Sequence, residues 1–323
     1  MTKYVISGYI GFDNFGDEAI AKVLTSHLKN IGAKKITVLS SCPEKTSKNY
    51  NVDSADFLKF YKPIMESDIL ISGGGSLLQD ITSLKSLIYY LAVIVTALVL
   101  NKKVIIFAQG FSDFRTKLGK FLTQFVLKYC DKIYVRDTKS QEILKNLNIN
   151  SELISDPVFS IEVNNSFKKS GVGIQLRSFQ TLSEKFLETL ANEISIQFPK
   201  EKIKLFSLQD SLDLPVLNKF AEILKNKNIE SEIIKNLSLE DEINELSKLE
   251  YLIGMRFHAN LISAKAGVKV LGINYDMKVS NLAKSIGFPI INLDQIALSK
   301  DFTRLKNLNP NEYIIPEFKF PEL

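Results

Sequence analysis

Two short stretches of the sequence concentrate side chains that can move a proton or hold an anion. The first reads GMRFHA and contains Arg256 and His258, and the second reads YDMK and contains Lys278. Histidine titrates near neutral pH, whereas arginine binds phosphate and carboxylate groups in a bidentate fork. The chain has only 2 histidines. The other one, His27, lies on the apolar stripe of an expected helix and is expected to be a half-buried packing residue, so His258 is the catalytic candidate.

Further cations and polar residues follow other segments that read as strands. Arg136 stands in VRDTKS, and Arg177 stands in LRSF. A single cation in a loop is usually solvated, but parallel sheets bind ligands at the carboxyl ends of their strands, where all these cations are expected. A small substrate that carries both a phosphate and a carboxylate would suit such a set. Gln209, in SLQD, also follows an expected strand and is a secondary candidate.

Two loops of the N-terminal half are rich in glycine. In SGGGS, Gly74 and Gly75 let a ligand approach the backbone, and we expect Ser76 to begin a helix whose positive end favours anions. Neither this loop nor SGYIGFDNFGDEAI has the GxGxxG or GK[ST] pattern of nucleotide-binding loops. In the loop SGYIGFDNFGDEAI, Asp17 is either a helix cap or a site residue. Asn14, to which we assign no capping role, is a candidate site residue.

Short segments rich in Val and Ile alternate with segments of helical periodicity along the chain. This alternation predicts an α/β protein with two Rossmann-like, doubly wound parallel-sheet domains. We expect an N-terminal domain over residues 1–163 and a C-terminal domain over residues 170–323, which ends in an extended tail. A return of this tail to the first domain stays open as an alternative. The expected strands are residues 3–7, 35–40, 68–72, 103–108, 132–136, 152–155, 171–176, 202–207, 230–234, 250–253, 269–273 and 289–292.

Composition excludes several classes of protein. The chain is 45% hydrophobic and 24% charged, and its net charge of +5 is too evenly spread for a nucleic-acid-binding face. Cys42 and Cys130 are far apart in the sequence, so we expect no disulfide framework, no metal site and a reducing, cytoplasmic location. The start of the chain reads as a strand, so no signal peptide is expected.

One apolar run, residues 86–100, invites a test for membrane association. It is shorter than the ~20 residues that span a bilayer, so we expect a buried helix. Peripheral contact with the inner face of the membrane stays open as an alternative.

Five stretches, taken in order, resemble the polysaccharide pyruvyl transferase family, and especially its bacterial cell-wall branch. They are GYIGFDNFGDEAI, SGGGSLLQDITSLKSLIYYL, QG, YVRDTKS and GMRFHANLISAKAGVKVLGINYDMKV. The resemblance implies two facing Rossmann-like domains, similar to those of GT-B glycosyltransferases. It also implies transfer of the enolpyruvyl group of phosphoenolpyruvate, as co-substrate, onto two hydroxyls of a sugar, with release of phosphate and without a cofactor. In the cell-wall branch the acceptor is a lipid-linked glycan that carries N-acetylmannosamine.

Residue roles follow from the same resemblance. The family's Arg-x-His motif matches Arg256 and His258, its downstream lysine matches Lys278, and the arginine of its RDxxS stretch matches Arg136. The resemblance implies that His258 is the general acid and that the three cations hold the phosphate and carboxylate of the donor.

The other candidates complete the expected site. Gly74 and Gly75 are expected beside the donor. An acceptor or secondary site is expected at Asn14, Asp17, Arg177 and Gln209. Asp13 departs from the residue that the family resemblance leads us to expect, so the identity of the acceptor sugar stays open.

Two other functions fit the same expected fold. A GT-B-type nucleotide-sugar glycosyltransferase would need carboxylates near the diphosphate, and Asp276 is the nearest one in the sequence to the cations of the second domain. A non-catalytic carbohydrate-binding protein would keep the fold without needing His258. The sequence leaves the oligomeric state open.

Overall fold

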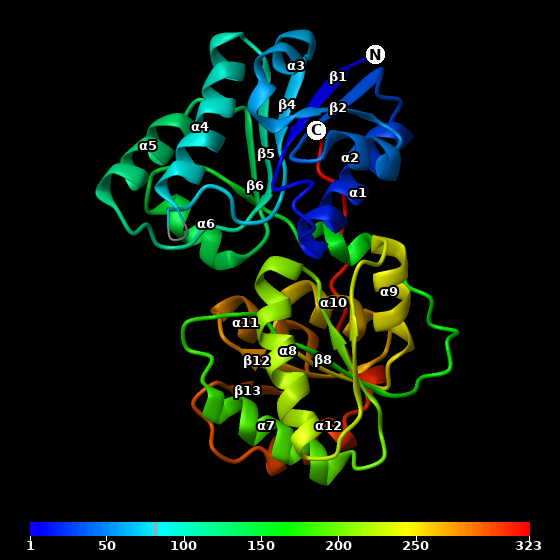
Figure 1. Cartoon of the computed structure of the whole chain (residues 1–323). Helices are drawn as coiled ribbons and strands as arrows, with labels where there is room; N and C mark the ends of the chain where they lie inside the picture. Colours follow the sequence, from blue (N-terminus) through cyan, green and yellow to red (C-terminus); the bar gives the residue numbers. More distant parts are fainter. Residues whose placement is uncertain (81–82) are drawn as a thin grey trace. The chain divides into compact units, whose positions relative to one another are not determined.

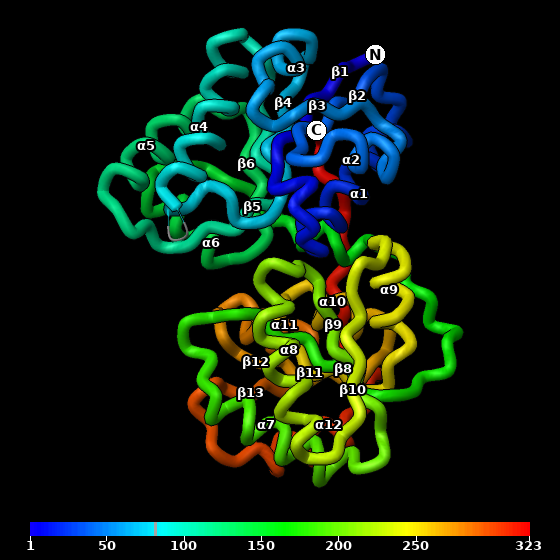
Figure 2. The backbone as a smooth tube through the Cα atoms, in the orientation of Figure 1, coloured from blue at the N-terminus to red at the C-terminus, as the bar shows by residue number. Residues whose placement is uncertain are grey.

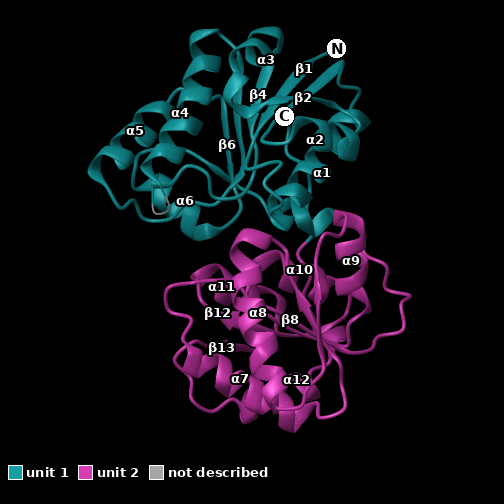
Figure 3. Cartoon of the chain, viewed as in Figure 1, with its two compact units in different colours: residues 1–161, 317–323 teal, residues 162–316 magenta. Residues whose placement is uncertain are grey.

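A computed structural model describes residues 1–80 and 83–323 of the chain, which is traced in Figure 1 and Figure 2. These residues form two compact units, coloured separately in Figure 3. Unit 1 comprises Met1–Ile161 and Glu317–Leu323, and unit 2 comprises Glu162–Pro316. Each unit has its own parallel sheet with helices on both faces, which confirms the predicted α/β class.

The sheet of unit 1 has the strand order β3-β2-β1-β4-β5-β6-β7. Its strands are β1 (Lys3–Ser7), β2 (Lys35–Ser40), β3 (Asp53–Asp56), β4 (Ile69–Ser72), β5 (Lys103–Gln109), β6 (Lys132–Val135) and β7 (Glu152–Leu153). Its helices are α1 (Phe15–Asn30), α2 (Pro43–Tyr50), α3 (Tyr61–Glu66), α4 (Leu84–Val99), α5 (Lys117–Leu127), α6 (Thr138–Lys145) and the short 3-10 helices η1 (Phe57–Lys59) and η2 (Pro157–Ser160). Successive side chains of a strand point to opposite faces. Accordingly, Val5 packs in the core beneath α4 and α5, whereas Tyr4 and Ile6 pack in the core beneath α1.

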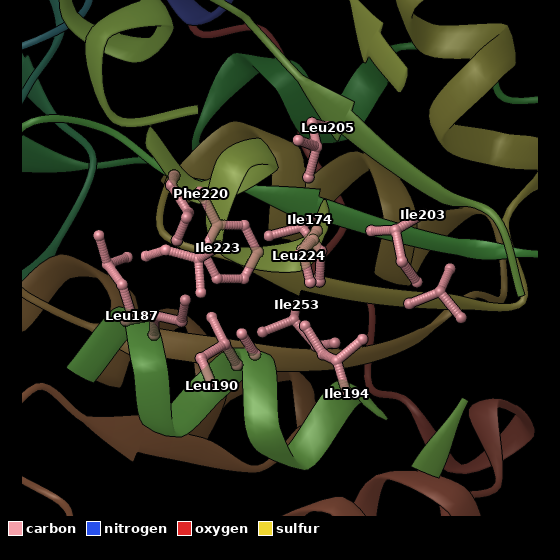
Figure 4. Packing of buried hydrophobic residues seen from close by; sticks show 14 of the residues in the cluster. Ile174, Leu187, Leu190, Ile194, Ile203, Leu205, Phe220, Ile223, Leu224 and Ile253 are labelled. Carbon is pink, nitrogen blue, oxygen red and sulfur yellow. The ribbon is translucent and has the colours of Figure 1, made fainter. Parts of the chain in front are cut away.

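The sheet of unit 2 has the strand order β10-β9-β8-β11-β12-β13. Its strands are β8 (Val172–Gln175), β9 (Ile203–Phe206), β10 (Ser231–Ile234), β11 (Tyr251–Gly254), β12 (Lys269–Asn274) and β13 (Ile290–Asn292). Its helices are α7 (Glu184–Gln197), α8 (Asp210–Asn226), α9 (Leu239–Lys248), α10 (Phe257–Lys265), α11 (Met277–Ile286), α12 (Ser299–Asn307) and the short 3-10 helix η3 (Pro310–Glu312). Apolar side chains of α7 and α8 pack against those of the sheet. Figure 4 labels Leu187, Leu190 and Ile194 of α7, Phe220 and Leu224 of α8, and Ile174, Leu205 and Ile253 of the strands.

Each of the strands expected from the sequence is present, with ends that differ by no more than two residues. The prediction missed β3, whose sequence DSAD has no run of apolar residues. It was wrong about a helix at Ser76, because the first helix after that loop is α4, which begins at Leu84 behind the cap Ser83.

The apolar run that invited a membrane test forms α4, a helix of 16 residues. Leu87, Leu91 and Ile94 lie on its buried side, against the sheet. Among the described residues, no helix has the length and apolar character needed to cross a membrane.

The C-terminal segment Glu317–Leu323 packs with unit 1, on the face of the sheet that α1 covers. Phe320 stacks on the ring of His27, with 3.5 Å between ring centroids, and lies 6.0 Å from the ring of Phe107. His27 is therefore a half-buried packing residue, as expected. The sequence assigns this segment to the second domain and leaves its return to the first open. Its aromatic side chains fill a core of unit 1, so the boundary of the second domain at residue 323 was wrong.

Candidate active site

Both sheets reverse their strand order beside the first strand of the unit. The reversal lies between β1 and β4 in unit 1 and between β8 and β11 in unit 2. In open α/β sheets, ligands bind at the carboxyl ends of the strands at such a point. In unit 1 a hollow at this point is lined by Gly8, Tyr9, Asp17, Gly73 and Gly74, together with apolar side chains.

In unit 2, Arg256 lies two residues after the end of β11 and forms a buried ion pair with Asp213 of α8. Its Nε and Nη2 atoms both donate to the carboxylate, at 2.9 Å to Oδ2 and 2.6 Å to Oδ1. The side chain of Arg256 is 8% exposed and that of Asp213 is 0% exposed. A bidentate pair in a buried place fixes the guanidinium in one orientation and offsets its charge locally.

The same carboxylate organises the loops around the pair. Asp213 Oδ2 accepts hydrogen bonds from the backbone N–H groups of Leu208 and Gln209, at 2.9 and 3.1 Å. The side-chain oxygen of Gln209 accepts from Arg256 Nη2 at 3.1 Å. Gln175, at the end of β8, accepts from the Arg256 backbone N–H at 2.8 Å and donates to Asp213. Gln209 is therefore a buried partner of the arginine.

His258 is the second residue of α10 and lies two residues after the cap residue Arg256. Its ring is half-buried and meets the ring of Phe257 edge to face, with 5.0 Å between centroids. The N-terminus of a helix carries partial positive charge and favours anions. The structure therefore places the imidazole at a helix end that would attract a phosphate or a carboxylate.

Two further cations follow neighbouring strands of the same sheet. Arg177, after β8, donates from Nη1 to the Tyr275 hydroxyl at 3.4 Å and lies 5.5 Å from the centre of that ring. Its Nε is buried without a hydrogen-bond partner among the described residues. Lys278 lies in the first turn of α11, whose cap, Asp276, accepts from the Lys278 backbone N–H at 3.0 Å. Because β8, β11 and β12 are adjacent and parallel, these cations belong to the same edge as His258.

In unit 1, Arg136 follows β6 and its side chain is buried as well. Its Nη1 donates to Asp156 Oδ2 at 3.1 Å and its Nη2 donates to Ser76 Oγ at 3.3 Å. The side chains of Arg136 and Asp156 are 7% and 3% exposed. Like Arg256, Arg136 holds a buried carboxylate, so the structure gives it a role in positioning the loop that contains Ser76.

The glycine loop after β4 is held by Gln109, a fully buried side chain of β5. Gln109 donates to the carbonyl of Gly73 at 2.8 Å and accepts from the backbone N–H of Leu77 at 3.1 Å. A Cβ at Gly74 would lie 2.6 Å from the Ile20 side chain of α1, and Gly75 has a φ of +89°. Close packing and backbone conformation therefore account for these two glycines in the protein itself.

In the loop between β1 and α1, the cap of the helix is Asn14 and not Asp17. Asn14 is the cap of α1 and accepts from the Gly16 backbone N–H at 3.2 Å, so the expectation that it has no capping role was wrong. Asp17 lies in the first turn, and its carboxylate oxygen is 2.6 Å from the position of a Cβ at Gly75. The side chain of Asp17 therefore borders the glycine loop.

Asp13 and Glu18 make contacts that hold the loop between β1 and α1 in its conformation. Asp13 has a φ of 54°, a conformation that Asp tolerates better than most residues, and it forms an ion pair with Lys45. Glu18 accepts from the Gly11 backbone N–H at 2.7 Å and from the Tyr50 hydroxyl. Burial raises the pKa of the Glu18 carboxyl above its ordinary value.

The sequence prediction missed both buried carboxylates, Asp213 and Asp156. A signal for Asp213 was present, because it precedes Val216, Leu217 and Phe220 at the spacing of the buried stripe of α8. An acid on an apolar stripe needs a partner. Within the described residues, no group of three or more His, Cys, Asp or Glu side chains could hold a metal ion.

Comparison with known proteins was made by sequence family, by curated sequence and by structure. A family profile described as polysaccharide pyruvyl transferase matches residues 14–277. No curated protein matches the sequence significantly.

Solved structures share the fold at low sequence identity. UDP-GlcNAc 2-epimerase from Methanocaldococcus jannaschii has a TM-score of 0.68 and 9% identity, over 97% of this chain and 94% of that one. The S. aureus MnaA–UDP structure has a TM-score of 0.69 and 10% identity, over 97% and 90%. A glycosyltransferase from Rickettsia africae has a TM-score of 0.63 and 13% identity, over 95% and 88%. These neighbours confirm a GT-B-type pair of Rossmann-like domains.

Proposed function

Because the chain belongs to the polysaccharide pyruvyl transferase family, we propose that it moves the enolpyruvyl group of phosphoenolpyruvate onto a sugar of a cell-wall or surface polysaccharide precursor. The product would be a pyruvate ketal, with phosphate released. The observation that carries this proposal is the position of His258, at the start of α10 and beside the strand-order reversal of a sheet whose edge also carries Arg177 and Lys278.

In the proposed reaction, His258 acts first as an acid. The protonated imidazole delivers its proton to the methylene carbon of phosphoenolpyruvate, so the neighbouring carbon becomes an oxocarbenium-like centre. One sugar hydroxyl attacks this centre and gives its proton to the imidazole. The bond to the phosphate oxygen then breaks, the second hydroxyl closes the ketal, and the last proton leaves with phosphate.

The charges around His258 suit the donor. Phosphoenolpyruvate brings a phosphate and a carboxylate, and the developing charge on departing phosphate is stabilised by donors that are already in place. The ion pair with Asp213 fixes the N–H groups of Arg256 in one orientation and offsets the charge of its guanidinium. Arg177 and Lys278 add positive charge at neighbouring strand ends. The N-terminus of α10 adds partial positive charge.

The test is release of phosphate from phosphoenolpyruvate that depends on a sugar acceptor. Candidate acceptors, among them glycans that carry N-acetylmannosamine, are analysed by mass spectrometry for the gain of one pyruvate less one water. We expect His258→Ala to lower turnover by about 10² or more. His27→Gln, the matched control at the other histidine, is expected to keep turnover. Normal turnover by His258→Ala would refute the assigned role.

A nucleotide-sugar glycosyltransferase is the second candidate, because a solved glycosyltransferase shares the fold. The buried carboxylate nearest to the cations of unit 2, Asp213, is bound to Arg256 and so is poorly suited to meet a sugar nucleotide. Release of a nucleoside diphosphate from a sugar nucleotide, without release of phosphate from phosphoenolpyruvate, would favour this candidate. Ligand binding that His258→Ala leaves unchanged, without turnover of either donor, would favour a non-catalytic carbohydrate-binding protein.

The proposed function also indicates where in the cell the reaction takes place. Phosphoenolpyruvate is a cytoplasmic metabolite, so we assign the protein to the cytoplasm, at the inner face of the membrane when the acceptor is lipid-linked. No cofactor is needed, because the donor supplies both the transferred group and the leaving group.

A further inference from the structure

Helices α4 and α5 lie side by side on one face of the sheet of unit 1 (Figure 1). Both helices also have exposed apolar side chains. On α4 the exposed residues Ile88, Val95 and Val99 recur at helical spacing and are 46%, 40% and 74% exposed. The buried sides of both helices face the sheet, so these side chains lie on the outer surface. Nothing in the described part of unit 1 covers them.

The outward side of α5 is more aromatic. Phe121, Phe125 and Tyr129 are 61%, 54% and 62% exposed, and Leu118 is 53% exposed. The three aromatic rings form a row, with 6.3 Å and 5.6 Å between successive centroids. Exposed rings arranged in a row are unusual on a surface that meets only water. We call the stripes of α4 and α5 together the α4–α5 face.

Basic residues are concentrated in the part of the sequence that forms the α4–α5 face. Between residues 83 and 130 the sequence has seven basic residues and one acidic residue, Asp113, a surplus of six that exceeds the net charge of +5 of the whole chain. The basic residues are Lys85, Lys102, Lys103, Arg115, Lys117, Lys120 and Lys128. Helices α4 and α5 themselves contain no acidic residue.

We propose that the α4–α5 face binds the surface of a bilayer that contains anionic lipids. Aromatic and aliphatic side chains would enter the boundary between headgroups and acyl chains, and the surrounding lysines would meet lipid phosphates. Phenylalanine, tyrosine and lysine are the side chains that favour this boundary. The proposal concerns attachment to the surface and does not require a membrane-spanning segment.

A second copy of the chain is a poorer occupant of the same face. Two copies joined through it would bring two sets of like charges together, and like charges that meet across an interface oppose association. A surface of anionic phosphates instead complements these lysines. The charge pattern therefore selects the bilayer over self-association.

The chain contains no tryptophan, so a single tryptophan can report on the face. Phe125→Trp is mixed with vesicles of phosphatidylcholine alone or with phosphatidylglycerol added. We expect a blue shift of emission with the anionic vesicles that falls as salt is added. Ile196→Trp on α7, which is 68% exposed, is the matched control and is expected to show no shift.

Charge is tested in the same assay. Lys117→Glu with Lys120→Glu, in the Phe125→Trp background, should weaken binding to anionic vesicles by about tenfold or more. An unchanged emission with anionic vesicles, equal binding to neutral ones, or a dimer that Phe121→Ser dissociates would each overturn the proposal. These measurements need neither phosphoenolpyruvate nor a sugar, so their failure is separable from a failure of the proposed function.

Discussion

The buried pair of Arg256 and Asp213 makes the sharpest prediction about stability. Asp213→Asn keeps the size of the side chain but removes the charge that faces the guanidinium. The pair is nearly sealed from solvent, with side-chain exposures of 8% and 0%. Breaking such a pair by neutralising one partner leaves a buried charge without compensation, which destabilises a protein by about 3–5 kcal/mol. Because a domain is stable by only about 5–15 kcal/mol, unit 2 should lose a large part of its stability.

The measurement must separate unit 2 from unit 1. Hydrogen exchange of peptides from β8 and β11, followed over a series of urea concentrations, gives the free energy of unfolding of unit 2 alone. We expect Asp213→Asn and Arg256→Met each to lower it by about 3 kcal/mol or more. In the double variant Asp213→Leu/Arg256→Met the loss should be smaller than the sum of the single losses, since no charge is then buried.

A second ion pair of unit 2 is the control. Arg304 pairs with Asp301 at 3.4 Å, and the arginine side chain is 71% exposed. Arg304→Met should change the free energy of unfolding by no more than about 1 kcal/mol. If Asp213→Asn costs less than about 1 kcal/mol, or if the Asp213 and Arg256 losses add without coupling, the guanidinium does not depend on Asp213 and the account of its fixed orientation fails.

Three further predictions concern unit 1. Gly75→Ala should destabilise unit 1 by about 1–3 kcal/mol, because Gly75 has a φ of +89°. Gly73→Ala should be tolerated, because the nearest atoms to its Cβ would lie at 3.6 Å. Urea unfolding of both variants checks this difference. Burial raises the pKa of the Cys130 thiol to about 12, so only the exposed Cys42 should react with Ellman's reagent in the folded protein, and both thiols should react in urea. Burial also raises the pKa of Glu18, and a carboxyl with a raised folded pKa loses its stabilising contribution as pH rises through that value. Glu18→Gln should therefore become more stable relative to the natural protein as the pH rises above about 4.5, and a difference in stability that does not change with pH would contradict this.

The strands could be predicted because parallel strands buried on both faces read as short apolar runs. The run VIIFA at residues 104–108 lies inside β5, for example. Strand β3 escaped the prediction because its residues Asp53–Asp56 are exposed or half-buried at the edge of the sheet, where no apolar run is required. The expected helix at Ser76 failed because Gly75 and Gln109 continue the sheet pairing past the end of β4.

The sequence predicted only part of the candidate site. Residue type and position after a strand identified Arg136, Arg177, Arg256 and Lys278 as cations at one edge of the sheets. Sequence did not separate the arginines held by buried carboxylates from the others, because the carboxylate of Asp213 lies 43 residues from its arginine along the chain. Such long-range pairing depends on how α8 packs against the sheet.

The packing of Phe320 against His27 has a consequence for how the protein is made. Residues 1–161 leave the ribosome first, but the core of unit 1 also needs Glu317–Leu323, which are synthesised after all of unit 2. Unit 2 can therefore finish folding while unit 1 still lacks its aromatic closing segment. During that interval Phe107 and the rest of that apolar surface stay uncovered, so nascent unit 1 is the part of the chain that a chaperone would be expected to protect.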